Sequence, residues 1–285
     1  MKIIKILFTV ALGMIAFGSF AQNENALLFK VSGNGITKPS YIFGTIHISC
    51  DVKFDAATTK ALDETTQLYL ELDIDDSELQ NKIMKSLSMK NGVTISSLVS
   101  PEDYRLLDDY FLQKMNVPIS AFNTYKPFFL SSMFLNTLLD CTPQSYENEL
   151  VKVSAFQNEP VFGLETVEEQ MDIFDQIPYQ LQVEELITSV KNDFRDDKTE
   201  LNILLKTYAT KDLNELSKVS STSKSTIMSD YEDLLLNNRN KKWLKLIQQI
   251  TKNKPTFFAV GAAHLSGDEG LIHLLRRNGY LVEPL

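Results

Sequence analysis

The stretch FFAVGAAHLSGDEG, Phe257 to Gly270, decides how this chain folds. Its first four residues are apolar, as in a buried strand, and that pattern stops at Gly261. His264 follows three residues after this glycine, and Ser266 with Glu269 fits a capping box, so a helix is predicted to begin directly afterwards. Thr166 with Glu169 likewise predicts a capping box and a helix start directly after Glu165. A buried strand that passes through a glycine and a polar residue into a helix is typical of α/β sheets.

The same phrase occurs near the other end of the chain. YIFGTIH, from Tyr41, also ends a strand pattern with a Gly-x-x-His spacing, here from Gly44 to His47. The chain contains three histidines in all, and two of them stand in this phrase. We therefore expect the two phrases to share one structural cause.

Strand patterns alternate with helical patterns along the rest of the chain. Strands are predicted over residues 26–31, 41–44, 67–73, 159–165, 256–261 and 280–282, the first two as a hairpin. This order predicts an α/β fold with a mixed, mostly parallel central sheet covered by helices. We expect one domain over residues 22–285, with a long helical insertion at approximately 178–250.

Four of the predicted strands each end at an ionisable side chain: His47, Glu71, Glu165 and His264. Because parallel strands present their carboxyl ends at one edge of a sheet, where ligands bind, these side chains are predicted to converge on one crevice. Arg239, late in the helical region, is a further candidate.

These residue types indicate metal-assisted hydrolysis. Two neutral imidazoles with carboxylates are suitable ligands for a divalent ion such as Mn²⁺, Zn²⁺, Co²⁺ or Fe²⁺. Such an ion activates a bound water at neutral pH. A carboxylate outside the ligand set would serve as general base, and Arg239 would stabilise an oxyanion.

Several alternatives remain open for these residues. Glu71 and Glu165 also fit acids placed at helix starts, where the helix dipole favours a negative charge. Arg239 also fits a surface position. All of the strand-end groups together could form an internal polar network with a purely structural role, since buried polar groups must be hydrogen-bonded.

The first residues predict export. Lys2 and Lys5 precede a short apolar run and a small-x-small cleavage site, so residues 1–21 are predicted to be a signal peptide. No later run is apolar enough for a transmembrane segment, so we expect a periplasmic or secreted protein. A net charge of −9 argues against nucleic acid as a partner. Cys50 and Cys141 either form a disulfide or are two unrelated buried thiols.

The phrases YIFGTIH, GLETVEEQ and AVGAAHLSGDEGL together resemble the TraB/PrgY/GumN family, which includes the Tiki proteases. The resemblance implies a fold related to the erythromycin-esterase and ChaN-like proteins and, for Tiki-like members, a metal-dependent peptidase activity. By this resemblance the two Gly-x-x-His motifs end at His47 and His264, the strand-end glutamates are Glu71 and Glu165, and Arg239 belongs to the late Arg-Asn phrase.

One departure from the family concerns the region before the third parallel strand. Family members often carry a Gly-hydrophobic-Asp phrase there, and this chain reads Ser145-Tyr146-Glu147, so Glu147 either replaces the aspartate or the role is absent. The leading hypothesis is an exported metal-dependent hydrolase that acts on a peptide or protein. The alternative is a non-catalytic protein that binds a peptide, haem or a metal ion in the same cleft. The sequence does not indicate an oligomeric state.

Overall fold

The computed structural model describes residues 25–285, and the predicted signal peptide lies outside this range. One six-stranded sheet has the order β4-β3-β5-β2-β1-β6. The strands are β1 (Leu28–Gly33), β2 (Ser40–Thr45), β3 (Leu68–Leu70), β4 (Val161–Gly163), β5 (Phe257–Gly261) and β6 (Tyr280–Pro284).

The four strands that end at ionisable residues run in the same direction. β4, β3, β5 and β2 are neighbours in parallel pairs, and β1 pairs antiparallel with both β2 and β6. The register places Thr45 beside Gly261 and Leu70 beside Gly163. The prediction of a mixed, mostly parallel sheet is therefore confirmed, and the carboxyl ends of the parallel strands are aligned.

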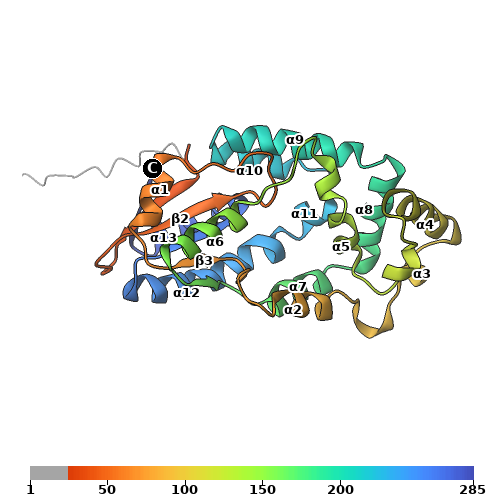
Figure 1. Cartoon of the computed structure of the whole chain (residues 1–285), viewed down its shortest axis with the longest axis horizontal. Helices are drawn as coiled ribbons and strands as arrows, with labels where there is room; N and C mark the ends of the chain where they lie inside the picture. Colours follow the sequence, from red (N-terminus) through yellow and green to blue (C-terminus); the bar gives the residue numbers. More distant parts are fainter. Residues whose placement is uncertain (1–24) are drawn as a thin grey trace, which may run out of the picture.

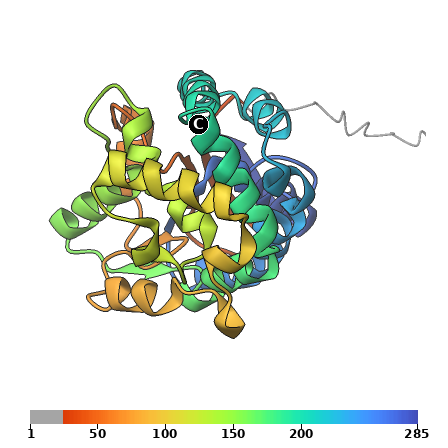
Figure 2. The same ribbon diagram turned by 90° about the vertical axis from the view of Figure 1, so that its right-hand side faces the viewer.

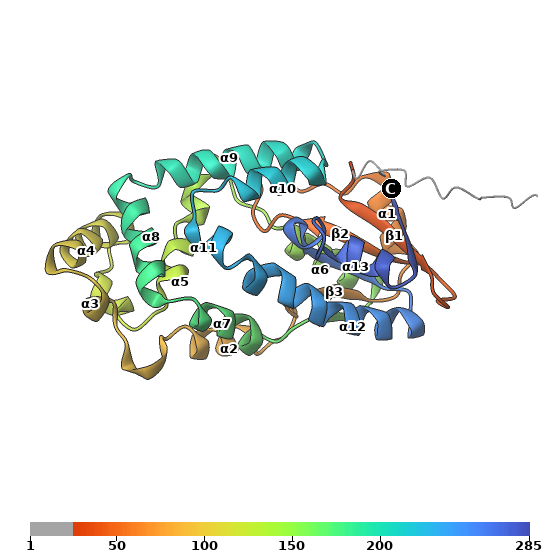
Figure 3. The same ribbon diagram turned by 180° about the vertical axis from the view of Figure 1, so that it is seen from behind.

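Helices cover both faces of the sheet. α1 (Ala56–Asp63) and α6 (Tyr146–Gln157) lie in front of the sheet in Figure 1. The opposite face carries α12 (Asn238–Asn253) and α13 (Leu271–Arg277), as the view from behind in Figure 3 shows. Both faces of β2 and β5 are consequently buried, which explains their nearly continuous apolar sequences.

A second, entirely helical lobe extends beyond the carboxyl ends of the parallel strands (Figures 1 and 2). It contains α2 (Leu79–Ser86), α3 (Ile95–Leu98), α4 (Pro101–Met115), α5 (Pro127–Ser132), α7 (Val167–Gln176) and α8 (Tyr179–Lys191). Its own core forms around Phe111, Leu130 and Leu186. Among residues 25–285, no helix combines the length and the apolar character that crossing a bilayer requires.

Three further helices connect this lobe with the sheet. They are α9 (Arg195–Ala209), α10 (Leu213–Ser221) and α11 (Thr226–Asp230), and α9 and α10 run side by side along one edge of the molecule (Figures 1 and 3). A π-helical turn, Asp233–Asn237, leads directly into α12. Single π-turns of this kind are frequent at functional sites.

Helix starts follow the predicted capping chemistry at one site and not at another. Thr166 and Glu169 form the expected capping box at α7. The second predicted box, Ser266 with Glu269, is wrong, because α13 begins at Leu271 after Gly270. The Glu269 carboxylate is instead paired with cationic side chains of α12 and α13.

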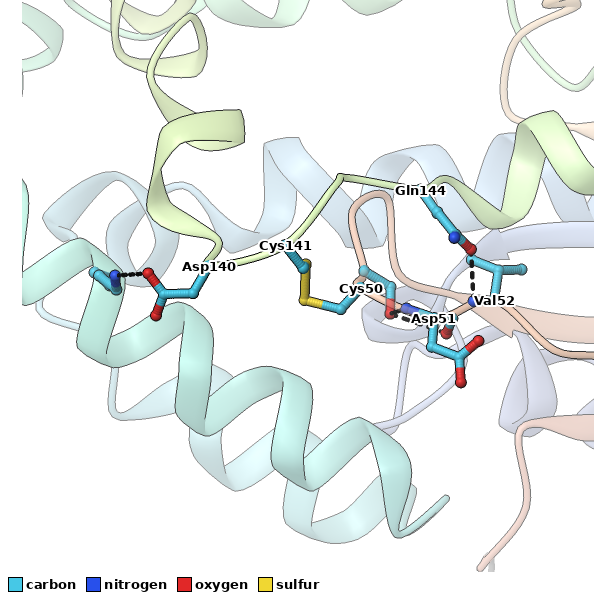
Figure 4. The surroundings of a disulfide bond; sticks show 8 residues. Cys50, Asp51, Val52, Asp140, Cys141 and Gln144 are labelled. Carbon is cyan, nitrogen blue, oxygen red and sulfur yellow. Dashed lines mark hydrogen bonds and ion pairs between the residues drawn. A yellow bond between two sulfur atoms is a disulfide. The ribbon is translucent and has the colours of Figure 1, made fainter.

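Cys50 and Cys141 form a disulfide, with 5.7 Å between their Cα atoms (Figure 4). The bond joins the loop after β2 to the segment before α6. Beside it the backbone N–H of Val52 donates to the side chain of Gln144 at 3.0 Å. The loop that carries His47 is thus held to the segment that leads to Glu147.

Candidate functional site

A cavity of about 290 Å³ opens at the carboxyl ends of β2, β3 and β5. Of the five predicted site residues, four line it: His47, Glu71, Arg239 and His264. Glu165 is not part of the lining and contacts Arg239 from behind. The structure therefore brings together residues from four distant parts of the chain, as the parallel strand order predicts.

Gly261 is the point on which three of these side chains converge. A Cβ atom at this position would lie 3.3 Å from Glu71 Oε1, 3.6 Å from His47 Nε2 and 3.7 Å from His264 Cδ2. The backbone N–H of Gly261 also donates to Glu71 Oε1 at 2.8 Å. The missing side chain of this glycine leaves the space around which the two imidazoles and the carboxylate are arranged.

The guanidinium group of Arg239 lies at the centre of the polar contacts. It donates to Glu71 Oε2 at 2.5 Å, to His264 Nε2 at 3.0 Å and to the carbonyl oxygen of Leu235 at 2.8 Å. Leu235 belongs to the π-helical turn, so this turn helps to direct the side chain. Arg239 is the cation of the site in this structure, and its side chain is only 12% exposed.

Glu165 holds Arg239 from the other side. Its carboxylate accepts from Arg239 Nε at 3.1 Å and from Nη2 at 2.6 Å, which is a bidentate ion pair. Gln170 of α7 donates to Glu165 Oε1 at 3.0 Å. Burial raises the pKa of Glu165, while Arg239 opposes that shift. Glu165 thus serves as the anchor of the guanidinium group and does not face the cavity.

The contacts of His264 define its tautomer. Since Arg239 can only donate, His264 Nε2 must accept, and the hydrogen therefore resides on Nδ1. Nδ1 lies 2.7 Å from Asn240 Oδ1, while Asn240 Nδ2 donates to the carbonyl oxygens of His264 and Glu269. The amide of Asn240 can thus only accept from this ring, which agrees with the same tautomer.

Burial lowers the pKa of His264 to about 3, so its ring is neutral at physiological pH. The ring centre lies 4.5 Å from that of Trp243, and the guanidinium carbon of Arg239 lies 4.6 Å from the Trp243 ring. Trp243 therefore packs against both groups and excludes water from their far side. A neutral imidazole with a lone pair on Nε2 is the form that binds a metal ion.

His47 has the opposite environment. Its Nδ1 donates to Glu147 Oε1 at 2.9 Å, and its Nε2 is directed towards the space beside Gly261. Glu147 also accepts from Thr45 at 2.6 Å and from Ser145 at 2.7 Å, which fixes the carboxylate. The hydrogen bond that His47 donates to Glu147 raises the pKa of His47 to about 9. Glu147 is therefore the carboxylate that orients the ring of His47.

Glu71 remains ionised next to these groups. Burial on its own would raise the pKa of this carboxyl, but the neighbouring His264 and Arg239 hold the pKa at about 2. Its two oxygens are used separately: Oε1 lies beside Gly261 and 3.7 Å from His264 Nε2, and Oε2 binds Arg239. The carboxylate is thus an anionic acceptor that faces both imidazoles.

The donor set agrees in kind with a divalent metal site, because it offers two imidazole nitrogens and a carboxylate oxygen around one small space. In residues 25–285, however, no group of three or more His, Cys, Asp or Glu side chains is arranged to hold a metal ion. The guanidinium of Arg239 instead binds both Glu71 and His264. A metal ion that used both ligands would have to displace Arg239 from them.

Sequence reasoning identified the cavity-lining residues but missed part of their support. Trp243 carries no motif of its own, Asn240 was noted only as part of the Arg-Asn phrase, Gln170 only as the end of the phrase GLETVEEQ, and Glu147 only as a departure from the family phrase. A further signal was helical spacing, because Trp243 lies one turn after Arg239. Arg239 and Trp243 therefore come to the site on the same face of α12.

Comparisons with known proteins identify distant relatives and a family. Metalloprotease TIKI2 of Danio rerio is 22% identical over 320 residues, which cover 92% of this chain and 61% of that protein. The Metalloprotease TIKI homolog of Nematostella vectensis is 20% identical over 324 residues, which cover 92% of this chain and 67% of the relative. No solved structure matches the chain. The TraB/PrgY/gumN family model matches residues 27–284, and the chain belongs to this family.

Proposed function

We propose that this protein is an exported, metal-dependent hydrolase that cleaves peptide bonds. Three residues would hold the divalent ion: His47, Glu71 and His264. The observation that carries the proposal is their convergence on Gly261, where a histidine from each Gly-x-x-His motif meets one ionised carboxylate. Supporting contacts prepare both rings for this role, because Asn240 and Glu147 each bind the Nδ1 side of one imidazole.

A divalent ion bound there would lower the pKa of a water and polarise a carbonyl oxygen. The chain's own residues would supply orientation and charge. His264 is neutral and has its Nε2 lone pair directed into the site, while His47 must lose a proton from Nε2 before this atom can become a ligand. Metal affinity would therefore depend on pH through His47.

Arg239 would have two roles in this proposal. Without a metal ion, its guanidinium pairs with both Glu71 and Glu165. When it releases Glu71 and His264, the bidentate pair with Glu165 would keep it beside the cavity. A guanidinium held there would stabilise the negative charge that develops on a peptide carbonyl oxygen during hydrolysis.

Peptides are the substrate class that the relatives support, since both are named metalloproteases. The cavity lining also includes the apolar side chains of Leu204, Leu216 and Met228, which suits amino-acid side chains. Export would follow from the predicted signal peptide over residues 1–21. The Cys50–Cys141 disulfide supports an oxidising compartment.

The test is cleavage of a mixed peptide library, followed by mass spectrometry. We expect products with the purified protein, their loss after chelation, and their return after Mn²⁺, Zn²⁺, Co²⁺ or Fe²⁺ is added. His47→Ala and His264→Ala should reduce turnover at least ~100-fold. His273→Ala is the matched control, because His273 bonds the backbone oxygen of Gly267 and does not line the cavity. Undiminished turnover in both variants, or full activity with chelator, would contradict the proposal.

One observation favours capture without cleavage as a second candidate. The guanidinium of Arg239 pairs directly with both buried carboxylates, so Glu71 already has a charge partner from the protein itself. A peptide, haem or metal ion would then bind in the cavity and leave unchanged. Retention of a ligand during gel filtration, together with no cleavage product for any added metal, would support this alternative.

A further inference from the structure

The cavity at the candidate site continues into a second cavity of about 480 Å³. The two share Leu204, Ser220 and Met228 in their linings. The second cavity lies between α9, α10 and the short 3-10 helix Leu135–Leu138, so it runs away from the strand ends along the α9 side of the molecule. We call the two together the α9 groove.

The second part of the α9 groove exposes apolar side chains. Leu135 is 42% exposed, Ile203 is 47% exposed and Met228 is 39% exposed. Scattered exposed apolar residues need no explanation, but these three line one continuous depression that starts at the candidate site. Apolar walls with few polar groups are typical of cavities that bind ligands.

The polar groups along the α9 groove suit a peptide backbone and a cationic end. The hydroxyl of Ser220, where the cavities meet, makes no hydrogen bond within residues 25–285 and is available to a peptide group. At the far end three carboxylates belong to the lining: Asp196, Asp197 and Glu200. Of these, Asp196 is paired with Lys224 at 3.1 Å, so the negative charge exceeds the positive charge.

We propose that the α9 groove binds the part of the substrate next to the cleaved bond, as an extended peptide with several apolar side chains followed by a basic residue. Because it names the substrate of the hydrolase proposed above, this inference rests on that function. A peptide is the expected occupant because the groove is continuous with the candidate site. The apolar walls favour apolar side chains on that peptide, and the excess of carboxylates favours a positive charge at its end.

The test is direct binding of fluorescein-labelled hexapeptides to the full chain, measured by fluorescence anisotropy. One peptide carries three consecutive leucines and then a lysine, a second has serines in place of the leucines, and a third has glutamate in place of the lysine. We expect the first to bind at least ~10-fold more tightly than the second, because apolar burial is lost. We expect the third to bind more weakly than the first, by about threefold at low salt, because charge attraction is lost.

Two variants locate the binding site. Ile203→Asn removes an apolar side chain from the groove and should weaken binding of the leucine peptide about tenfold. Phe156→Asn is the matched control on α6, since Phe156 is 88% exposed and lies outside the groove. This variant should bind like the wild type. Circular dichroism of both variants checks that each is folded.

The binding and cleavage results test the α9 groove and the hydrolase activity independently. Binding that depends on the leucines and on Ile203, without any cleavage, would support the groove and contradict the hydrolase. Cleavage of leucine and serine peptides with equal kcat/KM, unchanged in Ile203→Asn, would overturn the inference and leave the hydrolase intact. Equal binding of all three peptides would also overturn it.

Discussion

His47 and His264 follow the same Gly-x-x spacing at the ends of neighbouring parallel strands, yet their rings have opposite environments. The side chain of His47 is 70% exposed, and that of His264 is 4% exposed. Glu147 raises the pKa of His47 to about 9, whereas burial lowers the pKa of His264 to about 3. The shared Gly-x-x-His spacing therefore places both imidazole rings beside one space. The protonation state of each ring depends on the residues that the surrounding helices place next to it.

The two halves of the site differ in burial and in the number of supporting contacts. The His264 half is rigid and buried, because Arg239, Asn240 and Trp243 all come from α12 and all contact the ring or its partner. The His47 half faces the cavity and depends on one carboxylate of α6. Changes on the buried side should therefore affect stability as well as chemistry, whereas changes on the exposed side should affect chemistry with little effect on stability.

The largest effect is expected from Arg239→Ala on the buried side. This variant leaves Glu71 and Glu165 without their shared cation, and breaking a buried ion pair costs about 3–5 kcal/mol of unfolding free energy. Urea denaturation measures the loss. Lys242→Ala is the control on the same helix: it breaks an exposed pair with Glu169 and should cost less than ~1 kcal/mol.

A second variant keeps this prediction testable if Arg239→Ala does not fold. Arg239→Lys retains the positive charge but cannot form the bidentate pair with Glu165. Its loss of unfolding free energy should therefore be smaller than that of Arg239→Ala. Equal stability of the wild type, Arg239→Ala and Arg239→Lys would show that Arg239 is not the central cation. Divalent ions should also raise the melting temperature of Arg239→Ala more than that of the wild type, because the competing guanidinium is absent.

The second prediction uses pH to separate the two rings. A histidine with a lowered pKa is more protonated in the unfolded chain, so stability falls as pH drops below the unfolded value of 6.5. Between pH 6.5 and 4.5, the His264 ring should cost about 2 kcal/mol of unfolding free energy. The stability that the Glu71 carboxyl contributes is present above its unfolded pKa of 4.5 and is lost only as pH falls below that value, so it does not mask this window.

His47 should show the reverse dependence. Its raised pKa gives stability that is fully present below pH 6.5 and is lost as pH rises towards 9. The effect should be smaller, because the ring is exposed and screened. His264→Gln should flatten the acid side of the profile, and His47→Gln should flatten only the alkaline side. The same acid slope in wild type and His264→Gln would contradict the assignment.

The third prediction compares the two motif glycines. A Cβ on Gly44 would lie 2.8 Å from Leu265 Cδ1 and 3.1 Å from the Cα of Ala262, inside the packed core, so Gly44→Ala should cost about 1–3 kcal/mol. A Cβ on Gly261 would meet only side-chain ends at the cavity, so Gly261→Ala should cost less than ~1 kcal/mol. Urea denaturation compares the two.

Gly261→Ala should nevertheless fill the space between the rings. Isothermal titration with Mn²⁺ or Zn²⁺ should therefore show weaker binding to this variant than to the wild type. If Gly261→Ala proves more destabilising than Gly44→Ala, the space beside Gly261 is core packing and not a ligand position.

Whether a site residue could be predicted from the sequence depends on which structural element carries it. The strand-end residues could be predicted, because a parallel sheet aligns carboxyl ends whatever lies between the strands in the chain. The contacts of Arg239 could not, since they depend on how α12 packs on the sheet. Trp243 was missed for the same reason, and the contact of Asn240 with His264 could not be read from the Arg-Asn phrase. The capping box predicted at Ser266 does not form, and the Glu269 carboxylate pairs with Lys241 and Arg277 instead. A local sequence pattern cannot show such tertiary ion pairs.

The smallest effect is expected from Glu147→Gln on the exposed side. The amide oxygen can still accept from Thr45, but the negative charge beside His47 is lost, so the pKa of His47 should fall from about 9 towards 6.5. NMR titration of the imidazole protons measures this, and the unfolding free energy should change by less than ~1 kcal/mol. Glu149→Gln on α6 is the control, because Glu149 pairs with Lys152. An unchanged His47 titration would mean that Glu71, and not Glu147, sets the charge of the exposed ring.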